Sequence, residues 1–275
     1  MKKHSIAAAV IGLSLLMTST VFAAVNEDQT TGIVNITGHT SYADADKAVT
    51  EIPDGRLFRD QLINSKGSDM ALADARAQMT SYVRGLQMNG AATVGQYLDQ
   101  HADLKDRVDK MLRAANRDST SADADGFDIT LSFKLTGYDN SLSSILLPPT
   151  YVRAALPKPT AKITLEQDYT GLIVDYKDLD VKPAFQPALR DSSGRDIYFY
   201  NALNRNKVIV YGMVTYTSGD TSADIVGTNP MTVHAIGTAD HGTTLIISTE
   251  DADRILTANE KTDFFSQCAV VFHAL

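Results

Sequence analysis

The chain has 275 residues with 33 acidic and 25 basic side chains, which gives a formal net charge of −8 at pH 7. An acidic surface of this kind argues against binding to nucleic acid or to anionic lipid. Its one cysteine, Cys268, excludes an internal disulfide, so packing must stabilise the fold.

The N-terminus has the pattern of a cleavable export signal. Two lysines precede an apolar run of 12 residues, from Ile6 to Met17, and small side chains then predict cleavage between Ala23 and Ala24. The apolar run is well short of the roughly 20 residues that a membrane-spanning helix needs, and no later apolar segment reaches that length. We therefore expect a periplasmic or extracellular chain with no membrane span. Because no cysteine lies near the cleavage site, we expect no lipid anchor.

A proline-rich stretch divides the rest of the chain. Four prolines fall between Leu146 and Thr160, and each one removes a backbone donor and fixes φ, which indicates an extended connector. The predicted fold class is α+β, with an N-terminal helix-on-sheet domain followed by a strand-rich mixed α/β region. The predicted organisation is a signal peptide over 1–23, an N-terminal domain over 24–147, a connector over 148–160 and a C-terminal domain over 161–275.

The N-terminal domain begins with a short predicted strand from Gly32 to Gly38. Apolar residues at helical spacing follow over 69–88, with Asn89-Gly90 as the expected stop, and again over 98–115. The clearest strand spans 127–135, where apolar and polar residues alternate. We expect its apolar side to be buried beneath the two helices; this side consists of Phe127, Ile129, Leu131, Phe133 and Leu135.

Strands dominate the predicted C-terminal domain. The sequence Asp191-Ser-Ser-Gly194 is typical of a hairpin turn, because glycine tolerates positive φ. Ser248, followed by acidic residues, predicts the start of a helix. The predicted strands are 169–175, 184–189, 197–200, 208–216, 231–236, 244–247 and 269–272.

Motifs in both halves carry a family resemblance. The Gly-flanked strand 32–38, the helix Ala71-Leu-Ala-Asp-Ala-Arg-Ala77 and the strand ending Leu135-Thr-Gly137 resemble small bacterial envelope lipoproteins and flagellar ring proteins of the FlgP and FlgT kind. In the C-terminal half, Tyr169-Thr-Gly-Leu-Ile-Val-Asp175 and the stretch 245–253 look like exported proteins of the same family. The resemblance implies a non-lipidated envelope component that packs or assembles, with a flagellar association as one form of that role. It implies no catalytic residues.

The best candidate cluster for binding or chemistry is acidic. Asp175, Asp178 and Asp180 fall within six residues at a predicted strand end. Two carboxylates in a cleft can do acid–base work or bind a cation, whereas charges in the loop after a strand are more often solvated. The sequence assigns no catalytic residue beyond this candidate binding cluster.

Other patterns predict neither a metal nor a cofactor. His234 and His241 lack the spacing of a zinc-binding helix. The acidic stretch 123–128 lacks the glutamate of a calcium loop, which favours an ordinary turn. Cys268 lies just before an apolar terminal strand, which favours a buried thiol over a nucleophile.

The sequence therefore favours an exported, non-catalytic protein that assembles with itself or with other envelope proteins. One alternative is a cell-wall or glycan-binding module, for which an exposed row of Tyr198, Phe199 and Tyr200 would be the platform. The other alternative is a hydrolase that uses the aspartate cluster. A deep pocket gathering Asp175 with His234 or His241 would favour that alternative.

Overall fold

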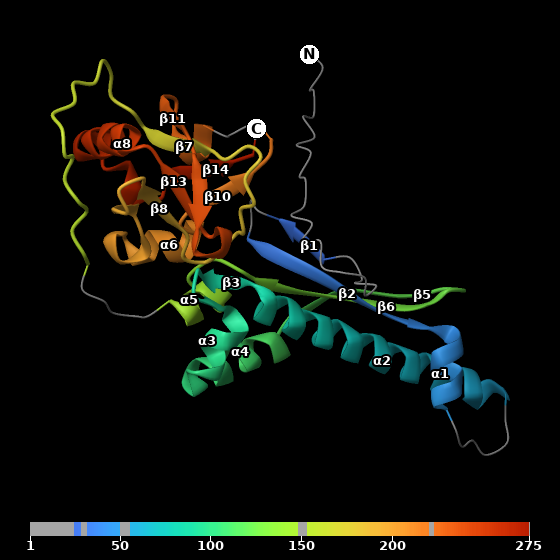
Figure 1. The fold of residues 1–275 in the computed structure, drawn as a ribbon. Coiled ribbons are helices and arrows are strands. Elements are labelled where there is room, and N and C mark those ends of the chain that lie inside the picture. Colours follow the sequence, from blue (N-terminus) through green and yellow to red (C-terminus); the bar gives the residue numbers. More distant parts are fainter. Residues whose placement is uncertain (1–24, 29–31, 50–55, 148–152, 220–222, 275) are drawn as a thin grey trace, which may run out of the picture. The chain divides into compact units, whose positions relative to one another are not determined.

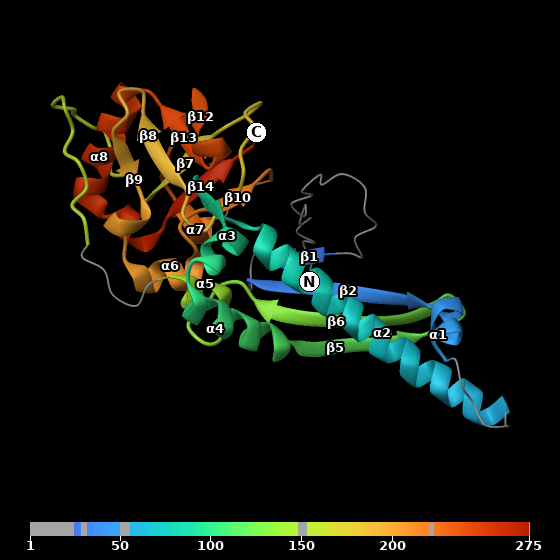
Figure 2. The ribbon, with the colours of Figure 1, turned by 60° about the horizontal axis from the view of Figure 1, so that its bottom comes forward.

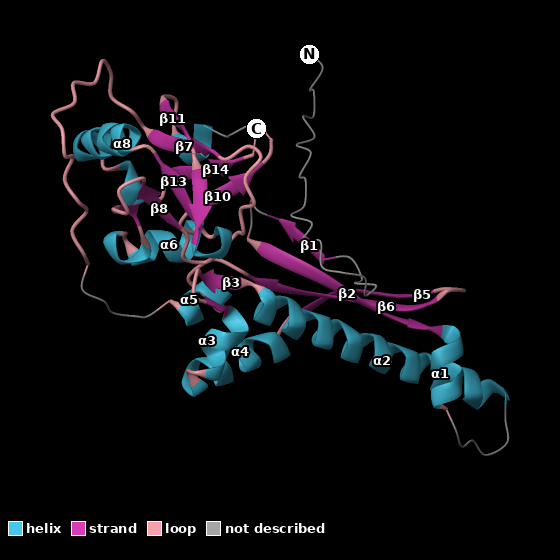
Figure 3. Cartoon of the chain, in the orientation of Figure 1, coloured by secondary structure: helices cyan, strands magenta, loops and turns pink. Residues whose placement is uncertain are grey.

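The computed structural model describes residues 25–28, 32–49, 56–147, 153–219 and 223–274. It contains helices and several sheets, which confirms the predicted α+β class (Figures 1 and 3). The predicted signal peptide, with its cleavage site between Ala23 and Ala24, lies outside the described residues, as does the start of the predicted connector.

The chain folds into two compact units. Of the described residues, the N-terminal unit comprises those up to Gly85 together with Leu98–Ile145, and the C-terminal unit comprises Leu86–Tyr97 together with those from Leu146 onwards. None of the described helices is long and apolar enough to cross a membrane.

The N-terminal unit is built on a four-stranded antiparallel sheet. Its strands lie in the order β1 (Val25–Asp28), β2 (Ile33–Ser41), β6 (Gly126–Lys134) and β5 (Asn116–Ala122). The alternation predicted for 127–135 is present, because Phe127, Ile129, Leu131 and Phe133 are all buried on one face. Leu135 lies past the end of β6 and is only partly buried.

The opposite face of this sheet is polar. The hydroxyls of Thr37 and Thr130 lie 2.9 Å apart, and His39 Nδ1 lies 2.7 Å from a carboxylate oxygen of Asp128. Cross-strand pairs of this kind add modest stability to a face that water can reach. The sheet therefore has one solvent-exposed face and one apolar face that another layer of structure must cover.

The helix α2 (Arg56–Gly85) supplies that layer and lies along β2 and β6 (Figure 2). Its buried positions recur every four residues, which is the spacing of one helix face. This face is made of small residues in the middle and larger ones towards its ends: Ile63, Gly67, Ala71, Ala75, Met79 and Val83. The shorter helix α1 (Tyr42–Ala48) packs on α2 and is capped by the Ser41 hydroxyl, which accepts the Asp44 N–H.

Two boundaries differ from the sequence prediction. The helix predicted for 69–88 begins earlier and ends at Gly85, because Asn89-Gly90 forms the turn between β3 (Gln87–Asn89) and β4 (Ala92–Thr93). The stripe over 98–115 is divided between α3 (Val94–Asp99) and α4 (Ala102–Arg113). A further short helix, α5 (Leu142–Leu146), follows β6.

The β3–β4 hairpin belongs to the C-terminal unit, although the sequence prediction placed it in the N-terminal domain. Its backbone carbonyls at Gln87 and Met88 accept the N–H groups of Phe185 and Gln186, at 2.9 and 2.8 Å. The hairpin thus pairs with a segment about 100 residues later in the sequence. Local patterns do not encode such pairing.

Two further sheets form the C-terminal unit. One is fully parallel, in the order β10 (Thr215–Thr217), β14 (Val270–His273), β7 (Gly171–Asp175) and β11 (Pro230–His234). The other is mixed, in the order β12 (Gly237–Ala239), β13 (Thr244–Ile247), β8 (Ala188–Asp191) and β9 (Asp196–Tyr198). The turn predicted at 191–194 joins β8 to β9, with Gly194 at a φ of +91°.

The helices that follow β9 in this unit are α6 (Arg205–Tyr211), α7 (Ala223–Val226) and α8 (Thr249–Thr262). The helix predicted to start at Ser248 is α8, and the Ser248 hydroxyl accepts the Asp251 N–H at 3.0 Å. A cluster of apolar side chains packs α7 against the parallel sheet, with Val226 beside Ile173 and Val271.

The strand predicted for 208–216 is wrong. Residues 205–211 form α6, and only Thr215–Thr217 form a strand. The side chain of Asn204 caps the helix by accepting the Asn206 N–H at 3.0 Å, and Gly212 ends it with a φ of +77°. These caps, together with burial of Val208 and Ile209, outweigh the strand preference of the β-branched run.

The β6 register yields a stability prediction. Phe133 is 5% exposed and lies edge-on to Tyr82, with ring centroids 6.4 Å apart, so Phe133→Ala should cost about 3–5 kcal/mol of unfolding free energy. Lys134, the exposed neighbour on the polar face, is the matched control, and Lys134→Ala should cost less than about 0.5 kcal/mol. Chemical denaturation measures both, and a larger loss for the Lys134 variant would contradict the register.

Candidate functional site at the carboxyl edge of the parallel sheet

The parallel sheet brings three titratable side chains into one row. In parallel strands all carboxyl ends meet at the same edge, which is where open α/β sheets bind ligands. The register places Asp175 of β7 between His234 of β11 and His273 of β14. Residues paired in register point to the same face of a sheet, so the three side chains share one side.

Asp175 is buried and hydrogen-bonded through both carboxylate oxygens. One oxygen accepts the Lys177 N–H at 3.0 Å, and the other lies 2.9 Å from His234 Nδ1. Because an ionised carboxylate only accepts, the His234 ring donates from Nδ1. His234 is 76% exposed, so most of its ring is accessible from solution.

The buried His273 is arranged differently. Its Nε2 lies 2.8 Å from the Gly219 carbonyl oxygen, which only accepts, so Nε2 carries the proton. The side chain is 7% exposed. This histidine therefore ties the β14 end to the loop after β10 and presents no free ring nitrogen at the surface.

The three predicted aspartates take different positions. Asp178 and Asp180 are exposed, and Asp178 has a left-handed backbone with a φ of +64°. Asp180 lines a wide hollow of about 310 Å³ whose lining includes neither Asp175 nor Asp178. The partner that the structure gives the buried Asp175 is thus His234, one of the two histidines that the sequence analysis named beside it, but the hollow at Asp180 includes neither of them.

The hollow beside Asp180 is formed by the loop before β13. Its residues Asp240, His241 and Gly242 all have positive φ, a strained arrangement for the first two. His241 Nδ1 donates to the Gly90 carbonyl at 2.9 Å, and Asp240 accepts from Arg190 and Thr244. These contacts hold the loop against the β3–β4 turn, so His241 lies in this hollow and not in the Asp175 row.

The aromatic row proposed for glycan binding lies largely inside the protein. Tyr198 is completely buried, its ring lies 4.7 Å from that of Phe265, and its hydroxyl donates to the Met213 carbonyl. Tyr200 is 7% exposed. Because a sugar must reach the face of an aromatic ring to stack on it, these two tyrosines do not provide the platform that the alternative requires.

A second buried network joins the connector to α8, and we call it the Arg195 clamp. Arg195 donates to Asp191 at 2.9 Å, to Asp253 at 2.7 Å and to the Lys158 carbonyl at 2.9 Å. Asp253 also accepts the backbone N–H groups of Thr160 and Ala161. Each carboxylate oxygen of Asp253 thus has two donors, which marks the clamp as structural.

The clamp changes the acidity of its carboxyl groups. Burial opposes ionisation of Asp253, but the hydrogen bonds from Thr160, Arg195 and Ala161 outweigh it and lower the pKa to about 2. The pKa of Asp191 is also lowered, because donors from Ser193 and Arg195 outweigh its burial. The negative form of each group is therefore the one that the fold stabilises.

The remaining candidates for chemistry have ordinary structural roles. Asp123 accepts the N–H groups of Asp125 and Gly126 and makes the acidic stretch a tight turn between β5 and β6. Burial raises the pKa of the Cys268 thiol to about 11, as expected for a packed cysteine. Within the described part of the chain, no group of three or more His, Cys, Asp or Glu side chains has the geometry of a metal site.

A family model described as Treponema pallidum Tp0624, second domain, matches residues 171–273. The match begins with the first residue of β7 and ends with the last residue of β14, so it spans the whole parallel sheet and the Asp175 row. This part of the chain is therefore similar to one domain of a Treponema pallidum protein. No curated protein matches the chain.

The Arg195 clamp predicts an acid-sensitive C-terminal unit. The folded-state pKa of Asp253 is about 2, below its ordinary value of 3.8, so the stability it contributes is present above about pH 4 and is lost as the pH falls towards 2. Asp253→Asn should cost about 3–5 kcal/mol near neutral pH, because Arg195 then loses a buried partner.

Denaturation at pH 6 and at pH 3 measures both effects. The substituted protein should show a smaller loss between the two pH values than the parent chain. The control is Asp178→Asn, a change at an exposed position that tolerates a left-handed backbone. Equal acid sensitivity of the parent and the Asp253 variant would contradict the assignment.

Proposed function

We propose that this chain is an exported protein of a bacterial envelope that works by assembling with copies of itself. The signal pattern of residues 1–23 supports export, and the similarity to a domain of a Treponema pallidum protein supports a bacterial setting. The resemblance to flagellar ring and envelope proteins supports assembly as the mode of action. The flagellar association belongs to the same proposal.

One observation carries the assembly proposal: three exposed apolar side chains lie on the packed helices α1 and α2. Phe58 is 64% exposed and Leu62 37% exposed, one turn apart on α2, and Tyr42 on the adjoining α1 is 40% exposed. We call these three residues the α1–α2 patch. Neighbouring apolar groups on a surface favour burial against a partner.

We propose a second copy of this chain as the partner that covers the patch. In an antiparallel pair of α2 helices with a two-fold axis beside Leu62, the Leu62 side chains of the two copies would be adjacent. A two-fold interface places the same surface of both copies in contact in this way.

The free edge of the sheet is a less suitable interface. All seven residues of β5 are exposed, but Asp118 is an extra residue in the pairing with β6, between Arg117 and Ser119. A bulge with charged side chains is typical of an edge that resists pairing with another strand. The α1–α2 patch is therefore the better interface.

Cross-linking tests self-assembly directly. Cys268 is buried, so a cysteine introduced on the surface becomes the reactive thiol. Ser65→Cys, on the α2 turn that follows Leu62, should give a covalent dimer with a short bis-maleimide. Ser81→Cys, exposed on the same helix but away from the patch, should not.

Combining Ser65→Cys with Phe58→Ser should reduce the dimer, because the patch then loses its most exposed apolar side chain. Equal yields from the Ser65 and Ser81 positions, or a dimer that is insensitive to Phe58, would contradict self-assembly. Cross-linking to a different envelope protein would also contradict it.

Export has its own test. The mature chain should begin at Ala24 and be recovered without lipid, because cleavage follows Ala23. Intact-mass measurement of the protein from its native envelope checks this. A large side chain before the cleavage site should block processing, so Ala23→Leu should leave residues 1–23 attached. A parent chain that keeps these residues would contradict the prediction.

A further inference from the structure

One edge of β2 is only partly covered by β1. The pairing reaches the point where Val25 lies opposite Ile36, and the described part of β1 stops there. The strand β2 continues beyond this point over Thr37–Ser41, and we call this segment the open edge of β2. Unpaired backbone groups along such an edge can pair with another chain, so proteins protect them.

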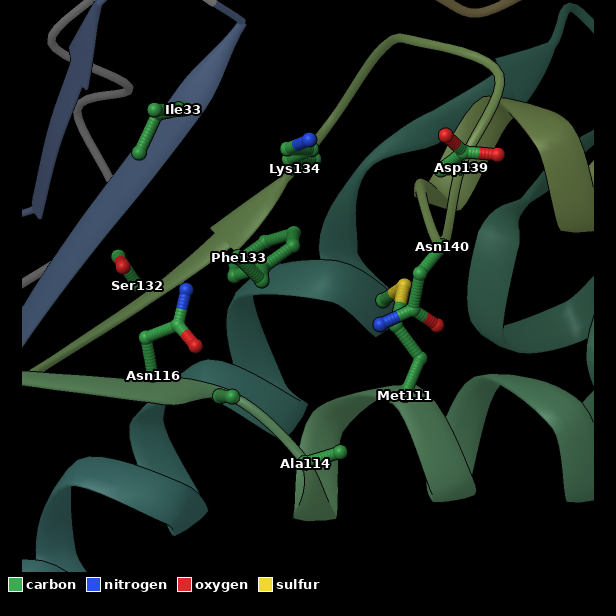
Figure 4. Close-up of a pocket in the computed structure, with 10 residues that line it drawn as sticks. Ile33, Met111, Ala114, Asn116, Ser132, Phe133, Lys134, Asp139 and Asn140 are labelled. Atoms are coloured by element: carbon green, nitrogen blue, oxygen red, sulfur yellow. The ribbon is translucent and has the colours of Figure 1, made fainter.

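The covered end of β2 lies beside a hollow of about 280 Å³ (Figure 4). Ile33 lines this hollow, together with Lys134 at the end of β6 and Asn116 at the start of β5. The open edge is at the other end of β2, and the lining of the hollow includes neither His39 nor Asp74. The contacts at the open edge are therefore separate from this hollow.

A carboxylate of α2 covers part of the open edge. Asp74 is partly buried and accepts the His39 N–H at 2.9 Å, so this backbone donor bonds a side chain of the helix. In an antiparallel strand the backbone groups of alternate residues face the same neighbour, so those of Thr37 face the same edge as the His39 N–H. Asp74 thus occupies the place that a longer β1 would reach.

This contact has an unmatched charge and an unmatched acceptor. The interactions of Asp74 with the described residues are the bonds from His39 and Gln78, and no cation is among them. Gln78 donates from Nε2 to Asp74 at 2.6 Å, while its Oε1 is buried and has no hydrogen-bond partner in the described part of the chain. A buried acceptor without a donor costs free energy. A cationic donor would satisfy both side chains.

The sequence supplies such a donor. The predicted cleavage before Ala24 leaves one residue ahead of Val25 and turns the Ala24 nitrogen into an ammonium group. If the register of β1 continues by one residue, Ala24 lies opposite Thr37. With a rise of about 3.4 Å per residue, its nitrogen is then roughly 4 Å along the strand from the His39 N–H. The Asp74 carboxylate bonded there is within reach of an ion pair.

We infer that the α-ammonium group of the mature chain binds to the Asp74 carboxylate and to Gln78 Oε1, and so holds β1 against the open edge of β2. This inference rests on the proposed export, because signal cleavage creates the charge at Ala24. In the precursor the same nitrogen belongs to a neutral peptide bond. Removal of the signal thus completes the protection of this edge against pairing with another chain.

A thermodynamic cycle tests the contact. Chemical denaturation compares the chain that begins with a free amine at Ala24 and the same chain acetylated at that amine. Acetylation removes the charge and should lower the folding equilibrium constant about fivefold, as expected for the loss of a favourable ion pair. In Asp74→Asn, which keeps an acceptor for the His39 N–H, acetylation should have no effect. Asp69→Asn, an exposed change on the same helix, is the matched control and should keep the full effect.

The cycle does not depend on signal processing, because both forms are produced with Ala24 as the first residue. A different cleavage site in the native protein is detected by its intact mass, whereas an error in the contact is detected by the cycle. No effect of acetylation on the parent chain, or an equal effect on the parent and on Asp74→Asn, overturns the inference.

Aminopeptidase digestion gives a second measurement that needs no substitution. A bound terminus should lose Ala24 at least about tenfold more slowly than a synthetic peptide of residues 24–31, because the enzyme must first detach it. Mass spectrometry follows both reactions. Equal rates for the folded chain and the peptide overturn the inference.

Discussion

The N-terminal unit depends on one close approach between backbones. A Cβ atom at Gly38 would lie 2.2 Å from the Ala75 nitrogen and 2.3 Å from the Ala71 carbonyl oxygen, so α2 rests on β2 at a distance that only glycine allows. A second approach occurs at Gly67, where a Cβ would meet the Phe127 ring. Because α2 is one continuous helix, these contacts fix its register on the sheet. They thereby fix which residues remain outside, including those of the α1–α2 patch.

The C-terminal unit depends on a different device. Its connector contains prolines that cannot donate backbone hydrogen bonds, so the connector does not form a regular helix or strand. The Arg195 clamp fixes its position instead, because Asp253 on α8 accepts the N–H groups of Thr160 and Ala161. A buried carboxylate with this many donors remains charged and keeps the extended segment in one place. Because Cys268 is the one cysteine of the chain, packing and such polar contacts stabilise this unit without a disulfide.

Local patterns predicted much of this fold but little of the candidate site. The sequence predicted the alternation of buried and polar side chains from Phe127 to Phe133 and the helix cap at Ser248. Both features depend on residues close together in the sequence, because the strand pleat and helix capping act over a few residues. The helix over 205–211 was not predicted, because its β-branched residues are of the type that favours strands. The sequence named both His234 and His241 as possible partners of Asp175 and could not choose between them, since the choice arises from the register of strands nearly 60 residues apart in the sequence.

The β3–β4 hairpin also constrains how this protein could have been assembled during evolution. A domain that is continuous in sequence can be moved by joining genes end to end. The C-terminal unit is not continuous, because Gln87 and Met88 pair with Phe185 and Gln186 across the intervening N-terminal residues. The family similarity covers 171–273 and leaves the hairpin out. A gene fragment that encodes only residues 171–273 would contain the parallel sheet. It would lack the β3–β4 hairpin, whose carbonyls accept the backbone N–H groups of Phe185 and Gln186.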